Sequence, residues 1–371
     1  MVAGVLVLDD GTVVEGTPFG AEGEAEGEVV FNTSMSGYQE YLTDPSYRYQ
    51  ILMPTYPLIG NYGITSERFE SDRIQVEGFV VRELCAKPSH GDLQKSLDGW
   101  LEENCVPGLA GVDTRFLTRK IRNFGVMLGI LKCPYDKKEL PDLVEKAKNL
   151  ESISNKDLIE LVTTKKPIIH NEGAKSGKTV VMIDCGLKRS MIRSLVDRDL
   201  KVVQVPATYS AKQILDYEPD GIMISNGPGD PEKAGYAVNT IQRLFDSQIP
   251  MFGICMGNQL IGLACGAKTS KLKFGHRGGN QPVKELSTGR AYVTSQNHGF
   301  VVDPETLSDE VAEVSHINLN DQSVEGLVHK ELPVFSVQFH PEAHCGPWDA
   351  DYLFDKFAGM LKKEGNTQTN R

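Results

Sequence analysis

The sequence has no uninterrupted apolar run that approaches the ~20 residues needed to cross a bilayer. Its first eight residues contain neither a basic segment nor an apolar core long enough for a signal peptide. Low-complexity tracts are missing too, and with 40% hydrophobic and 24% charged residues the composition is that of an ordinary folded protein. We therefore expect a soluble cytoplasmic protein with no membrane partner.

Paired cysteines and clusters of basic residues are also missing. The seven cysteines are scattered without a CxxC pair, which favours neither a disulfide framework nor a zinc site: Cys85, Cys105, Cys133, Cys185, Cys255, Cys265 and Cys345. The formal net charge is -11, with no dense group of Lys and Arg, so we expect no nucleic-acid partner. We expect no metal site. Most such cysteines are inert, so only local context can identify a reactive one.

A phosphate-binding loop is absent as well, although residues 173–179 come close to one. Gly173 and Gly177 have one residue too few between them, and the segment precedes a predicted strand instead of following it. We interpret this segment as part of a linker.

The length of 371 residues suits two domains. In the N-terminal part, apolar residues 5–8, an Asp10-Gly11 turn and a return strand at 13–14 predict an opening hairpin, and a helix is predicted from Pro141 to Leu150. From 152 to 177 the pattern gives way to Lys, Pro and Gly. We predict a β-rich α/β domain at 1–151, a linker at 152–177, a second domain at 178–365 and a tail at 366–371.

The second domain alternates short apolar runs with amphipathic segments. Strands are predicted at 179–183, 202–205, 221–224 and 251–254. This βαβ pattern predicts a doubly wound, mostly parallel α/β sheet. In such folds the chemistry lies at the carboxyl ends of the strands.

Cys255 stands between a predicted strand and a predicted helix. Gly253 and Gly257 flank it in a G-x-C-x-G arrangement, which permits the sharp turn of a nucleophile elbow. The N-terminus of the helix favours a thiolate, and the Met256 amide is placed to donate to an oxyanion. A buried, inert cysteine beside a glycine-rich turn is the alternative.

His340 is the histidine best placed to serve this cysteine. Residues 334–339 predict a strand that ends at His340-Pro341-Glu342, and period-two alternation puts His340 and Glu342 on one side. Glu342 would then fix the imidazole tautomer and leave the other ring nitrogen for Cys255. An ordinary loop at the end of a strand remains the alternative.

The loop at 225–231 is rigid through its prolines and open at Gly227 and Gly229. It suits close approach of the backbone to a ligand, or simply a tight turn between strand and helix.

Together these motifs resemble the class I glutamine amidotransferase family over about 178–361. The N-terminal half resembles the family of carbamoyl phosphate synthetase small subunits, so the likeness runs nearly end to end. The matching segments are Asn-Gly-Pro-Gly-Asp-Pro (226–231), Gly-Ile-Cys-Met-Gly-Asn-Gln (253–259) and His-Pro-Glu (340–342), then 31–40, 42–47, 111–115, 273–280 and 296–300.

The resemblance implies that Cys255 is the nucleophile, His340 the acid/base and Glu342 its orienting partner. Cys255 would attack the side-chain amide of glutamine, with the oxyanion held by the amides of Met256 and Gly227, and water would hydrolyse the thioester. The implied glutamine-binding residues are Ser46, Gly227, Gly229, Met256, Gln259, Asn297, Gly299 and Phe300. Because Ser46 lies in the N-terminal domain, the pocket is expected at the domain interface.

Two positions depart from the family pattern. Asn258 stands where histidine is frequent, and Phe339 where a small residue is common, so fine geometry is in question. The family uses neither His276 nor His298 as its base, and we expect both to be structural.

The resemblance also implies a partner. The ammonia would pass through a protein channel to a large subunit that uses bicarbonate and ATP with Mg²⁺ to make carbamoyl phosphate for pyrimidine and arginine synthesis. This chain itself needs no cofactor, and a heterodimer or higher oligomer is expected. A glutaminase serving another synthetase is one alternative, which leaves the N-terminal domain unexplained. A catalytically silent binding module is another, against which the intact Cys255, His340 and Glu342 argue.

Overall fold

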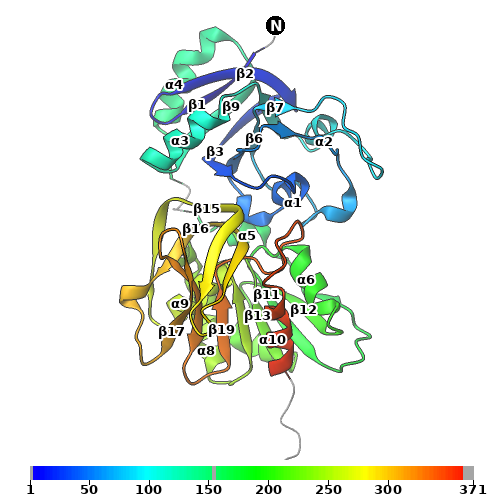
Figure 1. Ribbon diagram of the computed structural model, residues 1–371, viewed down its shortest axis with the longest axis vertical. Helices are drawn as coiled ribbons and strands as arrows, with labels where there is room; N and C mark the ends of the chain where they lie inside the picture. Colours follow the sequence, from blue (N-terminus) through cyan, green and yellow to red (C-terminus); the bar gives the residue numbers. More distant parts are fainter. Residues whose placement is uncertain (1–2, 153–155, 362–371) are drawn as a thin grey trace, which may run out of the picture.

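The computed structural model describes residues 3–152 and 156–361. Two domains lie one above the other along the long axis of the molecule, with the N-terminal domain at the top of Figure 1. The predicted tail at 366–371 lies outside the described residues.

The N-terminal domain is built on a closed barrel. Around the barrel the strands are β1 (Ala3–Leu8), β2 (Val13–Gly20), β8 (Pro107–Ala110), β6 (Gly78–Val80), β4 (Gln50–Pro54), β3 (Gly23–Asn32) and β9 (Met127–Tyr135). The predicted opening hairpin is confirmed, because Val7 of β1 pairs with Val13 of β2 in antiparallel register. Leu6, Val29 and Ile51 are fully buried in one cluster, so the barrel has an apolar core of its own.

Helices and short elements cover this barrel. They are α1 (Tyr38–Leu42), α2 (Leu97–Glu103), α3 (Thr114–Phe124) and α4 (Leu140–Lys148), with a small sheet of β5 (Leu58–Ile59) and β7 (Glu83–Leu84). Helix α4 confirms the helix predicted from Pro141 to Leu150, apart from its last two residues. Helix α1 lies at the lower end of the barrel, facing the second domain (Figure 1).

The C-terminal domain contains one large sheet. Its strands, in order across the sheet, are β10 (Ile168–His170), β12 (Lys201–Pro206), β11 (Thr179–Asp184), β13 (Gly221–Ile224), β14 (Met251–Ile254), β19 (Val334–Val337), β18 (Val324–His329), β17 (Ala312–Asn318), β15 (Lys268–Glu285) and β16 (Ala291–Asp303). All strands predicted at 179–254 are present within a residue of the expected bounds. The segment at 152–177 contributes helix α5 (Ile159–Val162) and the edge strand β10.

The centre of this sheet is parallel and has helices on both faces. Strands β12, β11, β13, β14 and β19 pair in parallel, which confirms the predicted doubly wound core. Helices α6 (Arg189–Val196) and α10 (Tyr352–Met360) cover one face, and α7 (Ala211–Leu215), α8 (Gly235–Phe245) and α9 (Met256–Ala264) the other. Because both faces are buried, these strands are mostly apolar.

The remaining strands are antiparallel, so the parallel pattern covers only part of the sheet. The long hairpin of β15 and β16 reaches the N-terminal domain (Figure 1), where the Thr33 amide donates to the Arg277 carbonyl oxygen. None of the described helices is long and apolar enough to cross a membrane.

Candidate active site

Cys255 sits in a strained turn between β14 and α9. Its φ of 55° and ψ of -101° are unfavourable for a residue with a side chain. A Cβ at Gly257 would lie 2.3 Å from the Ile224 carbonyl oxygen, and one at Gly253 would lie 2.7 Å from the backbone of Gly257. Only glycine fits at both positions, as the elbow pattern in the sequence predicts.

The Cys255 thiol is buried, with 2% of the residue exposed. Burial raises its pKa well above the ordinary value, and the carboxylates of Asp44 and Glu342 raise it further. The Lys188 ammonium and the Met256 amide, which hydrogen bonds to the sulfur, oppose this rise but are weaker. Burial of the thiol therefore opposes the thiolate that the helix N-terminus favours. The thiol needs a base.

His340 and Glu342 form a buried pair with a lysine behind them. His340 Nδ1 lies 2.6 Å from Glu342 Oε1, and Lys188 Nζ lies 2.7 Å from the same oxygen. Burial opposes ionisation of Glu342, but the Lys188 ammonium and His340 outweigh it and hold the pKa of Glu342 at about 2. Glu342 is therefore ionised, and it orients the imidazole through Nδ1.

The other imidazole nitrogen, Nε2 of His340, is buried and has no hydrogen-bond partner among the described residues. Strand β19 pairs with β14, and the Cys255 amide donates to the Val337 carbonyl oxygen at 2.9 Å. Cys255 and His340 therefore leave the same edge of the sheet from neighbouring strands. The strand ends at Val337, so a turn at 340–342, rather than strand alternation, brings His340 and Glu342 together.

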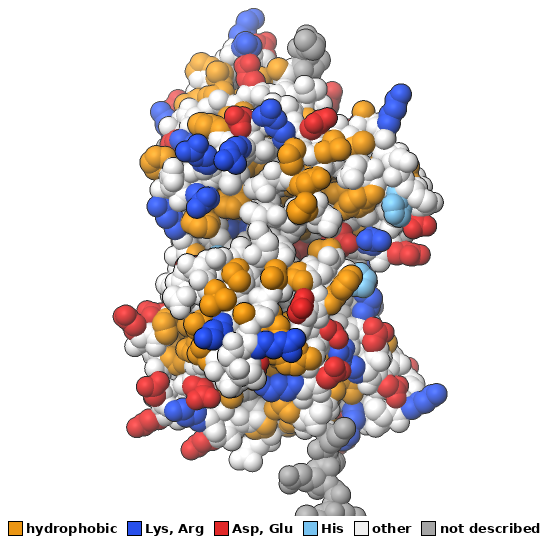
Figure 2. Space-filling view, in the orientation of Figure 1, with side chains coloured by type: hydrophobic (Ala, Val, Ile, Leu, Met, Phe, Trp, Pro, Cys, Tyr) orange, Lys and Arg blue, Asp and Glu red, His pale blue; other side chains and the backbone are white. Residues whose placement is uncertain are grey.

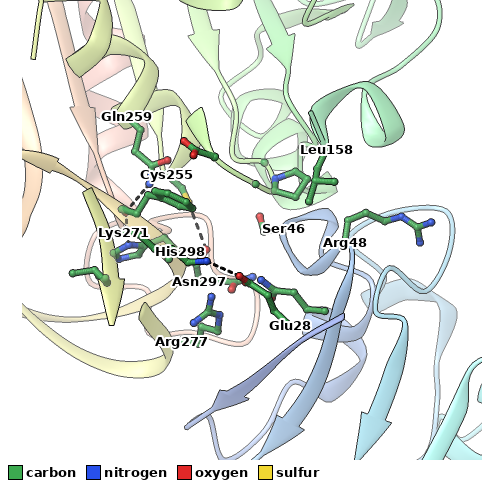
Figure 3. A pocket seen from close by; sticks show the side chains of 18 of the residues that line it. Glu28, Ser46, Arg48, Leu158, Cys255, Gln259, Lys271, Arg277, Asn297 and His298 are labelled. Atoms are coloured by element: carbon green, nitrogen blue, oxygen red, sulfur yellow. Dashed lines mark hydrogen bonds and ion pairs between the residues drawn. The ribbon is translucent and has the colours of Figure 1, made fainter. Parts of the chain in front are cut away.

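A cavity beside Cys255 gathers most of the residues expected to bind glutamine (Figure 3). Those that line it are Ser46, Gly227, Gly229, Gln259, Asn297, Gly299 and Phe300. Met256 contributes its backbone amide at the sulfur. Gly227 has no space for a side chain, since a Cβ would lie 2.1 Å from the Cys185 carbonyl oxygen. The loop backbone thus borders the cavity directly.

The two domains are joined at this cavity by buried polar contacts. Asp44 Oδ2 accepts from Asn297 Nδ2 at 2.9 Å, and its Oδ1 accepts from the Ser46 amide at 2.9 Å. Asn226 Nδ2 donates to Ser46 Oγ at 2.8 Å and to Asp44 Oδ1 at 3.3 Å. The N-terminal domain thereby supplies one wall of the site.

Sequence reasoning missed Asp44, Asn226 and Lys188 as individual residues. Asp44 and Asn226 lie inside motifs that the sequence singles out. Their closeness in sequence to Ser46 and Gly227 could have identified them as site residues. Lys188 gave no signal, since a lysine after a strand is ordinarily exposed, whereas here only 7% of its surface is.

His276 and His298 are engaged away from the thiol. His276 Nε2 lies 2.8 Å from Asp321 and its Nδ1 lies 3.5 Å from Glu325, contacts that overcome burial and raise its pKa to about 9. His298 Nδ1 lies 2.9 Å from the Phe300 carbonyl oxygen. His276, His298 and Glu325 together have the ligand types and spacing for a metal ion. Their ring nitrogens already have protein partners, which indicates a structural network.

The two departures from the family pattern occupy buried positions. Asn258 joins α9 to the neighbouring strand, donating to Gln338 Oε1 at 3.2 Å and accepting from Ser336 Oγ at 2.8 Å. Phe339 packs edge-on against His316. The Asn258 side chain is thus held by hydrogen bonds, and the Phe339 ring is held by packing.

Comparison with known proteins finds two family models that match separate parts of the chain. The family model "Carbamoyl-phosphate synthase small chain, CPSase domain" matches residues 6–131, and "Glutamine amidotransferase class-I" matches residues 181–360. The carbamoyl phosphate synthase small chain of Methanopyrus kandleri is 52% identical over 361 residues, which cover 96% of this chain and 99% of the relative. That of Methanocaldococcus jannaschii is 53% identical over 362 residues, covering 97% and 99%. This chain therefore belongs to the carbamoyl phosphate synthase small chain family and carries a class I glutamine amidotransferase domain.

Proposed function

We propose that this chain hydrolyses L-glutamine to glutamate and ammonia through a thioester on Cys255. The observation that carries the proposal is the strained, buried Cys255 at the edge of one cavity, with the His340–Glu342 pair leaving the adjacent strand. A nucleophile on an elbow, a base with a free nitrogen and an orienting carboxylate are the parts of a covalent acyl-transfer site.

The reaction divides into two halves. His340 Nε2 takes the Cys255 proton as the sulfur attacks the side-chain amide carbon, and the amides of Met256 and Gly227 stabilise the oxyanion. The tetrahedral intermediate collapses, the C–N bond breaks, and the imidazolium gives its proton to the leaving nitrogen, which departs as ammonia. His340 then removes a proton from water, which attacks the thioester, and glutamate leaves as the thiol is reprotonated. Ionised Glu342 stabilises the imidazolium in both halves.

We propose further that the ammonia is used by a carbamoyl phosphate synthase large chain bound to this one. Asn297 lines the cavity of Cys255 and also a second cavity, whose wall includes His340, Glu40 and Cys345. This second space would receive ammonia released beside His340. Bicarbonate, ATP and Mg²⁺ would bind to the large chain, and carbamoyl phosphate would serve pyrimidine and arginine synthesis in the cytoplasm. The unit would be a heterodimer or an oligomer of heterodimers.

The alternatives explain less. If this chain were the glutaminase of another synthetase, the match of residues 6–131 to the carbamoyl-phosphate synthase small chain model would have no explanation. A silent binding module leaves the strain at Cys255 and the buried charges of Lys188 and Glu342 unexplained.

The test is ammonia release from glutamine, with and without the large chain, for the parent protein and Cys255→Ala. We expect a loss on the order of 10³-fold or more, because removing the nucleophile of a covalent mechanism abolishes that route. Cys265→Ala removes a buried thiol at the other end of α9 and serves as the matched control, with near-parent activity expected. Parent-level activity in Cys255→Ala would overturn the assignment.

A further inference from the structure

An ion pair crosses from one domain to the other at the cavity beside Cys255. Glu28 lies on β3 of the N-terminal barrel, and Lys271 lies on β15 of the C-terminal sheet. Glu28 Oε1 and Lys271 Nζ are 2.6 Å apart, and both residues line the cavity. Figure 3 shows this contact as a dashed line between the two domains. Neither side chain belongs to the catalytic group or to the residues expected to bind glutamine.

The pair lies at the open end of the cavity. Among the described residues that line the cavity, Lys271 alone is exposed, with 40% of its side chain open to solvent. The Glu28 side chain is 13% exposed, and Cys255 is 2% exposed. Exposure to solvent therefore rises from the sulfur outward to the ion pair. Glutamine that enters or leaves the cavity at this end passes beside the two charges.

Lys271 also contacts the wall that the β15–β16 hairpin gives to the cavity. It pairs directly with Phe300 of β16, and its ammonium lies 5.9 Å from the centre of the Phe300 ring. The Phe300 carbonyl oxygen accepts from Gln259 Nε2 at 2.7 Å. Regular pairing of β15 with β16 stops after Lys271 and resumes at His276. The contact with Glu28 therefore holds β15 immediately before its irregular segment.

We propose that Glu28 and Lys271 are positioning residues that hold the β15–β16 hairpin against β3 and so keep glutamine in the cavity, an assignment that rests on the proposed function. With the pair formed, the two domains meet at the open end, and Phe300 stays beside Gln259. With the pair broken, the hairpin separates from β3 more often, and glutamine leaves faster. The pair acts on retention of the substrate more than on the chemical step, because Cys255 lies at the closed end.

Steady-state ammonia release by the complex with the large chain tests the pair. Glu28→Gln and Lys271→Met each remove one charge. A partly exposed ion pair shifts an equilibrium by up to about fivefold, so we expect KM for glutamine to rise about three- to fivefold, with kcat changed less than about twofold. The exchanged variant Glu28→Lys/Lys271→Glu restores the attraction with reversed charges, and its KM should return to within about twofold of the parent value.

Two controls separate the pair from a general effect of charge. Lys95→Met removes a lysine whose side chain is 39% exposed and pairs with Glu103 inside the N-terminal domain. This variant should keep the parent KM, because its ion pair does not join the domains. High NaCl screens exposed charges, so it should raise the KM of the parent and leave that of Lys271→Met nearly constant.

The accessibility of Cys255 gives a readout that does not depend on glutamine hydrolysis. An opened cavity admits iodoacetamide, so Glu28→Gln and Lys271→Met should both speed the alkylation of Cys255 about three- to fivefold, measured by mass spectrometry. Removing a negative charge and removing a positive charge shift the pKa of a thiol in opposite directions. Faster alkylation in both variants therefore reports opening of the cavity.

The outcomes distinguish this assignment from the proposed function. A parent-like KM in both single variants, or parent-like alkylation in both, would overturn the role of the pair. An exchanged variant with the summed losses of the single variants would also overturn it, because each side chain would then act by itself. A parent complex that releases no ammonia from glutamine would instead overturn the proposed function, and the alkylation rates would still test the ion pair.

Discussion

At the scale of single residues, the site depends on a row of buried charges. Glu342 Oε1 lies 2.7 Å from Lys188 Nζ on one side and 2.6 Å from His340 Nδ1 on the other. All three side chains are nearly inaccessible to solvent. Lys188 keeps Glu342 ionised, and Glu342 favours the tautomer whose Nε2 is free to take a proton. Because burial raises the pKa of Cys255, the thiol needs a base that takes its proton as the sulfur attacks.

Glu342→Gln tests this row. The amide keeps the shape but neither stabilises the imidazolium nor pairs with Lys188, so we expect ammonia release to fall by about 10²- to 10⁴-fold. Single-turnover assays measure the chemical step directly. Glu310→Gln, at an exposed glutamate, is the control and should retain parent activity. Parent-level turnover in Glu342→Gln would contradict the role of the carboxylate.

The same variant should also change the pH dependence of stability. The pKa of Glu342 is lowered from an ordinary value of 4.5 to about 2, so its ionised form stabilises the folded state above about pH 4.5. That contribution is lost as the pH falls from 4.5 toward 2. Denaturant unfolding should therefore show the parent more stable than Glu342→Gln at pH 6, with a gap that closes toward pH 2. A gap that does not vary with pH would be inconsistent with the lowered pKa.

At the scale of elements, the strand-to-helix turn of β14 and α9 brings the thiol to the cavity. The helix lies so close to β13 that the Gly257 amide donates to the Ser225 carbonyl oxygen at 3.1 Å. The same close packing forces Cys255 to a positive φ, which a residue with a side chain adopts only when its surroundings require it.

Gly257→Ala should push α9 away from β13, since the new methyl would meet the Ile224 carbonyl oxygen at 2.3 Å. We expect a loss of about 1–3 kcal/mol or more in the free energy of unfolding, with ammonia release falling because the thiol and the Met256 amide move. Gly359→Ala in α10 is the matched control, since nothing lies within 4 Å of its Cβ. It should stabilise the protein by about 0.5–1 kcal/mol. Equal stability of the two variants in thermal and denaturant unfolding would refute the close-packing explanation.

At the scale of the whole molecule, the site exists only where the two domains meet. Asp44 and Ser46 enter from the N-terminal domain and hydrogen bond to Asn297 and Asn226 of the other. Each of these groups is almost entirely buried, so separating the domains would leave them unpaired and would open the cavity.

Asp44→Asn tests this connection. The variant places an amide donor or a weaker acceptor against Asn297 Nδ2, so we expect KM for glutamine to rise on the order of 10-fold or more. The Asp44 carboxylate raises the pKa of Cys255, so its removal should also speed the alkylation of Cys255 by iodoacetamide at pH 7.5. Mass spectrometry measures the rate of this alkylation. Asp142→Asn, at an exposed aspartate of α4, is the control. Unchanged alkylation would show that Asp44 does not act on the thiol.

Much of the fold could be predicted from periodicity, and less of the site. The strands at 221–224 and 251–254 agree with the structure residue by residue, because both are short, apolar and buried on both faces. The antiparallel strands are harder to predict from the sequence. Strand β15 pairs with both β16 and β17 and is mostly half-exposed, so its apolar and polar residues do not alternate clearly. The strand predicted through Phe339 ends at Val337, where the chain turns to bring His340 to Glu342.

The sequence by itself determined the glycines around Cys255, the order of the motifs and the family, because these depend on local sterics and on the run of residues. The tertiary structure decided the direction in which the pKa of the thiol is shifted, since burial, Asp44 and Glu342 together outweigh Lys188 and the Met256 amide. It also decided the partner of Lys188, because a counter-ion such as Glu342 is contributed by a residue that is distant in the chain. Burial and long-range charge arise only on folding, and they determine how Cys255 can react.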